Sequence, residues 1–128
     1  MCVKEWKRIA DREAMRYRDS KAFQKGVEDA AGVLSARYRE SCRWTLAVEC
    51  VLKYLDRTDA EKARFFRVWY GIDGQRRRPD RKGMIALSLE WNVATSTLYV
   101  WRKELRTLLV IAAAQTGALR PFRMDPPS

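Results

Sequence analysis

Glycine and proline, the residues that most often interrupt helices, are scarce in this sequence. It holds 6 Gly and 4 Pro in 128 residues, and three of the prolines fall within the last eight positions. Long stretches therefore lack helix breakers, which favours helices over strands. Hydrophobic residues make up 47% of the chain, enough to supply a core. The sequence predicts an all-α fold of one domain, or of one small domain with a helical extension.

The N-terminal region, residues 1–56, carries apolar residues at helical spacing. Two helices are predicted first, with a break and cap at Asp19-Ser20. Their apolar residues are Val3, Trp6, Ile9 and Ala10, followed by Phe23, Val27, Ala30, Ala31 and Leu34. A third helix, from about Ser41 to Leu55, is expected to bury Leu46, Val48, Val51, Leu52 and Leu55. We assign this region to oligomerisation or to contact with a partner.

A fourth helix is predicted over residues 59–70. Thr58 and Glu61 match the capping box, in which the threonine accepts from the Glu61 amide and the carboxylate reaches back. One of the two adjacent phenylalanines would be buried with Trp69, and Gly71 suits the left-handed position just after the helix. The next segment, IDGQRRRPDRKG, has two glycines, a proline and five basic residues. We expect it to form a loop.

Residues 84–93 match the first half of a helix-turn-helix, in which two short helices pack across a turn of three or four residues. A helix of about 84–90 would place Ile85, Ala86 and Leu89 on its buried side, with the small Ala86 where the second helix crosses. Asn92 tolerates the positive φ that the turn requires. Val93 would fill the corner.

A second helix is predicted after this turn, continuing toward Gly117. Leu98, Trp101 and Leu105 form its buried stripe at positions i, i+3 and i+7. Ala94 stands where serine is most common, so Thr95 or Ser96 would have to cap the helix one or two residues later. The region 57–119 is thus predicted to be a helix-turn-helix unit, and residues 120–128 a disordered tail.

Basic residues are concentrated around this motif. The chain has a net charge of +10; residues 57–106 carry 12 basic and 6 acidic side chains, against 12 and 9 in residues 1–56. This balance implies an anionic partner, most often nucleic acid. The first turn of a recognition helix contacts base edges, and cations further along or in the loop contact phosphates. The helix residues predicted to contact DNA, all expected to face away from the core, are Thr95, Ser96, Thr97, Tyr99, Arg102, Lys103 and Arg106. The predicted contacts of the basic loop are Arg76, Arg77, Arg78, Arg81 and Lys82.

From about Leu46 to Leu109 the order of elements resembles region 4 of sigma-70-type factors. The similar parts are LDRTDAEKARFFRVWYG, with its aromatic-glycine pair Tyr70-Gly71, a basic loop, and MIALSLEWNVATSTLYVWRKELRTLL. The YVWRKEL segment and the chain length are similar to ArpU/RinA-type late transcriptional regulators of phages of Gram-positive bacteria. The resemblance implies a DNA-binding activator of phage or prophage late genes. Ala94 and the long basic linker depart from the pattern.

Other classes of function remain open at this point. A small terminase-like DNA-packaging protein also carries a helix-turn-helix, and the motif could instead contact RNA polymerase. Two recognition helices on spaced half-sites gain specificity, which favours a homodimer through the N-terminal helices. We predict no enzyme and no cofactor, because the chain has no histidine, no glycine-rich phosphate loop and no nucleophile–base set. Asp11 with Glu13, or Glu28 with Asp29, could form a magnesium site, but surface carboxylates explain them better.

Cysteine content and apolar run length predict the compartment. Cys2, Cys42 and Cys50 form no CxxC pair, and their odd number suggests a reducing cytoplasm. The longest apolar run, 108–114, has seven residues, well short of a membrane span. We expect a cytoplasmic protein associated with the nucleoid of a bacterial host cell, with no membrane contact and no metal site.

Overall fold

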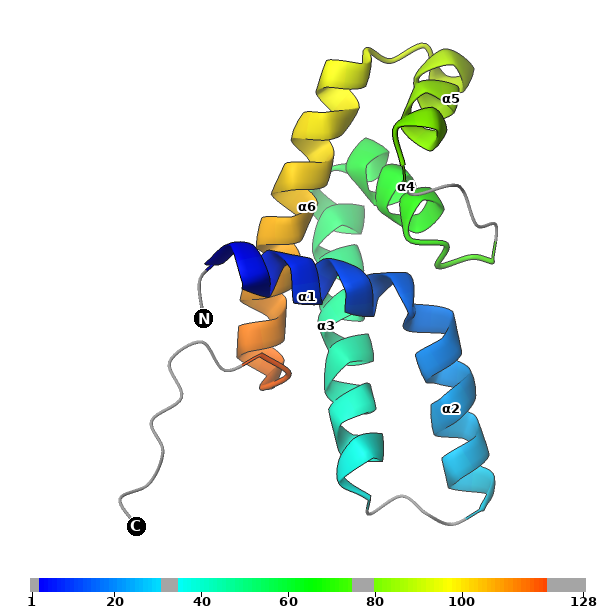
Figure 1. The fold of residues 1–128 in the computed structure, drawn as a ribbon, viewed down its shortest axis with the longest axis vertical. Helices are drawn as coiled ribbons and strands as arrows, with labels where there is room; N and C mark the ends of the chain where they lie inside the picture. The colour runs from blue at the N-terminus through cyan, green and yellow to red at the C-terminus, as the bar shows by residue number, and fades with distance from the viewer. Residues whose placement is uncertain (1–2, 31–34, 75–79, 120–128) are drawn as a thin grey trace.

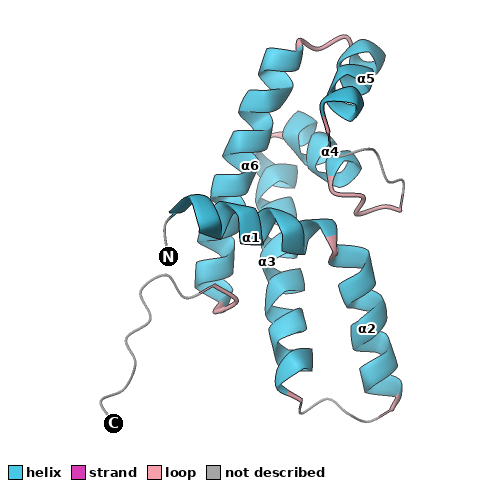
Figure 2. Ribbon diagram, in the orientation of Figure 1, coloured by secondary structure: helices cyan, strands magenta, loops and turns pink. Residues whose placement is uncertain are grey.

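The computed structural model describes residues 3–30, 35–74 and 80–119, which form six helices and no strand (Figures 1 and 2). The all-α prediction is confirmed. The helices are α1 Val3–Met15, α2 Tyr17–Asp29, α3 Ala36–Thr58, α4 Ala60–Trp69, α5 Arg81–Trp91 and α6 Thr95–Thr116. No helix in these ranges is both long and apolar enough to cross a membrane. The predicted tail 120–128 lies outside the described residues.

The two longest helices, α3 and α6, pack side by side and form the centre of the molecule. Helix α1 crosses both of them, while α2 lies along the first half of α3 (Figure 1). Helix α4 packs on α3 and α6, and α5 packs on α6. Buried side chains from α1 (Ala10), α3 (Val51) and α6 (Leu109) belong to one continuous core. Since α3 also runs across positions 56 and 57, the N-terminal region and the predicted unit 57–119 share that core.

The break between the first two helices was predicted at the wrong place. Helix α1 ends at Met15 and the chain turns at Arg16, whereas Asp19 and Ser20 lie inside α2. Ala14, one residue before the end of α1, is fully buried in the core. The turn therefore falls where α1 has finished packing and the chain changes direction to follow α3. Packing thus outweighed the capping preference of Asp and Ser.

Helix α3 is longer than predicted, and one residue of its predicted buried stripe is exposed. The Ser35 hydroxyl caps it by accepting from the Tyr38 amide at 3.1 Å. Val48, Val51, Leu52 and Leu55 are buried as expected, but Leu46 is 50% exposed. Leu46 lies two residues before Val48, hence about 200° around the helix, on the opposite face.

Asp59, not Thr58, caps α4. The Asp59 carboxylate accepts from the Lys62 amide at 3.2 Å, and Thr58 is the last residue of α3, where its hydroxyl donates to the Tyr54 carbonyl. The predicted capping box is therefore wrong. Both phenylalanines of α4 are fully buried. Gly71 has φ = 65° just after the helix, as predicted.

Candidate nucleic-acid interface

The turn between α5 and α6 has the conformation that the sequence predicted. Asn92 ends α5 in the left-handed region, with φ = 53° and ψ = 46°. The amide of Val93 donates to the Ser88 carbonyl at 3.1 Å, and the Ser88 hydroxyl donates to the Val93 carbonyl. These bonds satisfy carbonyl and amide groups that a helix end otherwise leaves open. Val93 packs against the core at the corner.

Helix α5 is longer than predicted and faces the other way. The Asp80 carboxylate caps it by accepting from the Gly83 amide at 2.9 Å. Gly83, Met84 and Leu87 are buried, whereas Ile85 and Ala86 are exposed and Leu89 is 79% exposed. Ala86 therefore does not lie at a helix crossing. The apolar residues of α5 occur on both sides of the helix, so their spacing alone could not select the buried face.

Arg81 and Lys82 belong to the first turn of α5, not to the preceding loop. Both side chains are exposed, and they lie on α5 and not on α6. The three arginines 76–78, which the sequence placed at flanking phosphates, lie outside the described residues. The loop is consequently shorter than predicted, because Asp80 starts the helix three residues earlier.

Helix α6 begins at Thr95 without a side-chain cap. Ala94 occupies the cap position with extended backbone (φ = −59°, ψ = 139°), and its carbonyl accepts from the amides of Thr97 and Leu98. The expectation that Thr95 or Ser96 would cap the helix later is wrong, since both lie in its first turn. Leu98 and Leu105 are fully buried and Trp101 is partly buried, as predicted. The helix ends before Gly117, which has φ = 81°.

The exposed face of α6 is narrower than predicted. Among the residues expected to face outward, Ser96, Tyr99 and Lys103 are exposed, whereas Thr95 and Thr97 are only partly exposed. Val100, Glu104 and Thr107 are also exposed on this face and were missed. The positions 96, 100, 103 and 107 have helical spacing, so the pattern could have identified them. Val100 was passed over because it is apolar, although it is exposed at the surface.

Two arginines of α6 do not face outward as predicted. The Arg106 side chain turns to α1, where its Nε and Nη2 lie 3.2 and 3.4 Å from the Asp11 carboxylate oxygens. Arg102 lies over the Trp69 ring, 5.2 Å from guanidinium carbon to ring centroid, and its Nε is buried. Long cationic side chains lie along apolar surface in this way when packing favours it. A helical wheel of α6 alone cannot show these neighbours, because Asp11 is distant in sequence.

Asp11 joins three helices through its carboxylate. Besides Arg106, it accepts a hydrogen bond from the Tyr70 hydroxyl at 2.6 Å. Burial raises the pKa of Tyr70 well above its usual value of 10.0, and the negative charge of Asp11 adds to this rise. Tyr70 therefore stays protonated and donates. The contact fixes α6 against α1 and the end of α4.

An aromatic cluster holds α4, α5 and α6 together behind the exposed face. Phe65 stacks on Trp69 with ring centroids 5.8 Å apart, and it meets Trp91 and Trp101 edge-on at 6.4 and 6.0 Å. The guanidinium carbon of Arg64 lies 4.3 Å from the centre of the Trp91 ring. Such aromatic pairs contribute beyond the area they bury. These contacts pack α4, the end of α5 and α6 against one another behind the turn.

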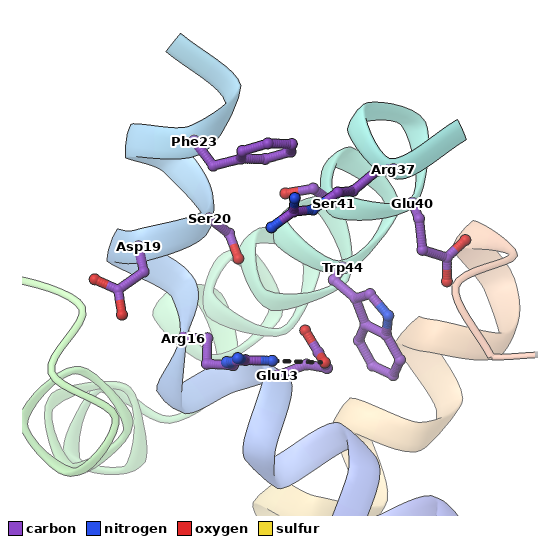
Figure 3. Close-up of a pocket in the computed structure, with 9 residues that line it drawn as sticks. All are labelled: Glu13, Arg16, Asp19, Ser20, Phe23, Arg37, Glu40, Ser41 and Trp44. Atoms are coloured by element: carbon purple, nitrogen blue, oxygen red, sulfur yellow. Dashed lines mark ion pairs between the residues drawn. The ribbon is translucent and has the colours of Figure 1, made fainter. Parts of the chain in front are cut away.

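A separate hollow of about 380 Å³ lies between α2 and α3, and Figure 3 shows the side chains that line it. Arg16 forms an ion pair with Glu13, 3.9 Å from Nη1 to Oε1. Arg37 lies over the Phe23 ring at 4.6 Å. Two arginines and three carboxylates share this lining, so it offers no surface of a single sign to a nucleic acid.

The carboxylates considered for a magnesium site are not gathered into one. Asp11 is bound to Tyr70 and Arg106, and Glu28 accepts from the Tyr38 hydroxyl at 2.6 Å. Within the described ranges, no three carboxylate or cysteine residues are placed to hold a metal ion.

Comparisons with protein-family models, curated proteins and solved structures gave no match for this chain.

Proposed function

We propose that this chain is a sequence-specific double-stranded DNA-binding protein that acts as a transcriptional regulator of phage or prophage late genes. Helices α5 and α6 would form its helix-turn-helix, with α6 in the major groove. The observation that carries the proposal is the left-handed turn at Asn92. It joins two packed helices, and Ser96, Tyr99 and Lys103 are exposed in the first three turns of α6.

The exposed residues of α5 and α6 suit the two tasks of DNA recognition, which are contact with base edges and contact with phosphates. Hydroxyl groups bond to base edges of several kinds, and an apolar side chain contacts the thymine methyl group. Ser96, Tyr99 and Val100 supply these chemistries. Lys103 follows two turns after Ser96, and Arg81 and Lys82 stand exposed at the start of α5. These cations would contact phosphates, which position the protein without reading sequence.

Selection of bound duplexes from a random-sequence DNA library tests the proposal. We expect the wild type to enrich one motif, and Tyr99→Ala to change or broaden that motif more than it lowers affinity. The control is Leu46→Ala on α3, because Leu46 is similarly exposed (50% against 42%). Recovery of no motif by the wild type, or an equal effect of both variants, would contradict sequence-specific binding by α6.

The molecular mass in solution distinguishes regulation from DNA packaging. A regulator is expected as a monomer or dimer, and a dimer would enrich a motif with two half-sites. A large closed ring would instead indicate a packaging protein. Sedimentation of the full chain, with and without the selected duplex, gives this result.

A further inference from the structure

We propose that the N-terminal helix α1 forms a second DNA contact, a basic pocket for a backbone phosphate flanking the groove that α6 enters. The pocket has a volume of about 460 Å³ and lies between α1 and α6. This inference rests on the proposed DNA binding. It extends the interface to a region that the sequence assigned to oligomerisation or partner contact.

The pocket is lined by cations from both helices. Lys4, Lys7 and Arg8 lie on one face of α1, at positions i, i+3 and i+4. Arg106 joins them from α6. Within the described part of the chain, the three cations of α1 form no ion pair with a carboxylate. Their charges therefore remain available to an anion.

The two acidic residues of the pocket do not cancel this charge. Asp11 already binds Arg106 and the Tyr70 hydroxyl. Glu5 is exposed at the rim. Two nitrogens of Arg106, Nε and Nη2, bond to the Asp11 carboxylate. Because a guanidinium has five N–H donors, those on Nη1 remain for a phosphate oxygen. Four cations against two carboxylates leave the lining net positive.

The position of the pocket matches the width of a major groove. With a rise of about 1.5 Å per residue, Arg106 lies about 15 Å beyond Ser96 along α6. The major groove of B-DNA is about 12 Å wide. A helix that enters the groove with its first turn would therefore meet the phosphate wall near Arg106, where α1 packs across α6 (Figure 1).

The test compares two double variants that remove the same charge from different places. Lys4→Gln with Arg8→Gln alters the pocket, whereas Lys25→Gln with Arg39→Gln alters the far ends of α2 and α3. All four side chains are exposed and none forms an ion pair in the described ranges. Both variants should therefore melt like the wild type, which circular dichroism checks.

Duplex affinity is then measured between 50 and 200 mM salt. Each lost phosphate contact lowers the slope of log affinity against log salt by about 0.9. For two contacts, the loss of affinity over this fourfold range should be about tenfold smaller in the α1 double variant than in the wild type. The α2–α3 double variant should keep the wild-type slope. Hydroxyl-radical footprints should also shorten at one flank with the α1 variant alone.

Glu5→Gln tests the pocket through a gain of duplex affinity, whereas the double variants test it through a loss. Removing this rim carboxylate should raise duplex affinity severalfold, a gain that misfolding cannot produce. Equal slopes in the two double variants, or no gain with Glu5→Gln, would overturn the α1 contact while leaving DNA binding by α6 intact. If the wild type binds no duplex at 50 mM salt, the proposed function fails and the α1 contact with it.

Discussion

At the scale of single residues, the turn between α5 and α6 depends on the backbone of Asn92. Its φ of 53° is the sole positive value among the described non-glycine residues. Left-handed backbone costs most L-residues about 1–2 kcal/mol. The cost is smaller for Asn, because its short side chain can form a local hydrogen bond. The sequence could identify this position because the requirement is local.

Substitutions at Asn92 should separate backbone conformation from side-chain chemistry. Asn92→Gly should leave the free energy of unfolding unchanged or slightly raised, because glycine adopts positive φ without a steric penalty. Asn92→Val should lower it by about 1–2 kcal/mol. Urea unfolding of both variants measures this difference. Equal destabilisation by the two would show that the Asn92 side chain, not its φ, holds the turn.

The ion pair between Asp56 and Arg67 gives a pH-dependent prediction. Arg67 donates two hydrogen bonds to the carboxylate, at 2.8 and 2.7 Å, and these hold the pKa of Asp56 below its usual value of 3.8. Because the pKa of Asp56 is lowered in the folded state, the ion pair stabilises the protein at pH values above 3.8. This stabilisation is lost as the pH falls through the lowered pKa.

We therefore expect Asp56→Asn to be less stable than the wild type at pH 7, by a small margin because the pair is exposed. The difference should shrink as the pH falls below 3.8, the usual pKa of an aspartate, and vanish below the lowered pKa of Asp56. Thermal melts at pH 7, 5 and 3 measure it. A difference that persists undiminished at the lowest pH would show that the asparagine acts through something other than the lost charge.

At the scale of elements, the sequence predicted which segments are helices better than which faces they bury. The stripe of α6 was predicted well because Leu98, Trp101 and Leu105 leave one apolar side. In α5 the apolar residues surround the helix, and the exposed Leu89 was taken for a core residue. The turns of Arg102 and Arg106 toward Trp69 and Asp11 depend on partners from other helices, which no local pattern contains.

Helix α6 lacks a side-chain cap, which allows a stabilising change. Ala94 has extended backbone that suits a serine cap, and replacing alanine with a capping residue is worth about 0.5–2 kcal/mol. Ala94→Ser should raise the free energy of unfolding by that amount. Ala114→Ser, on the exposed side of the same helix, is the control and should give no gain. Equal effects of the two serines in urea unfolding would contradict the assignment of Ala94 as the cap position.

At the scale of the whole molecule, the shared core sets the geometry of the proposed interface. Helices α1, α3 and α6 pack together, so the N-terminal region supports α6. The sequence divided these regions because the basic excess begins near residue 57, although the resemblance already starts at about Leu46. Neither the charge difference nor the resemblance predicts packing between distant segments, such as the contact of Asp11 with Arg106.

The most direct test of the proposed DNA binding is a fluorescence-anisotropy measurement. It follows binding of the full chain to a duplex that carries the selected motif, as a function of salt. We predict that log affinity falls linearly with log salt, with a slope of about 0.9 per phosphate contact. Lys103→Ala should reduce that slope by about 1, and Lys25→Ala should leave it unchanged. No binding to any duplex at 50 mM salt, or an affinity indifferent to salt, would contradict the account.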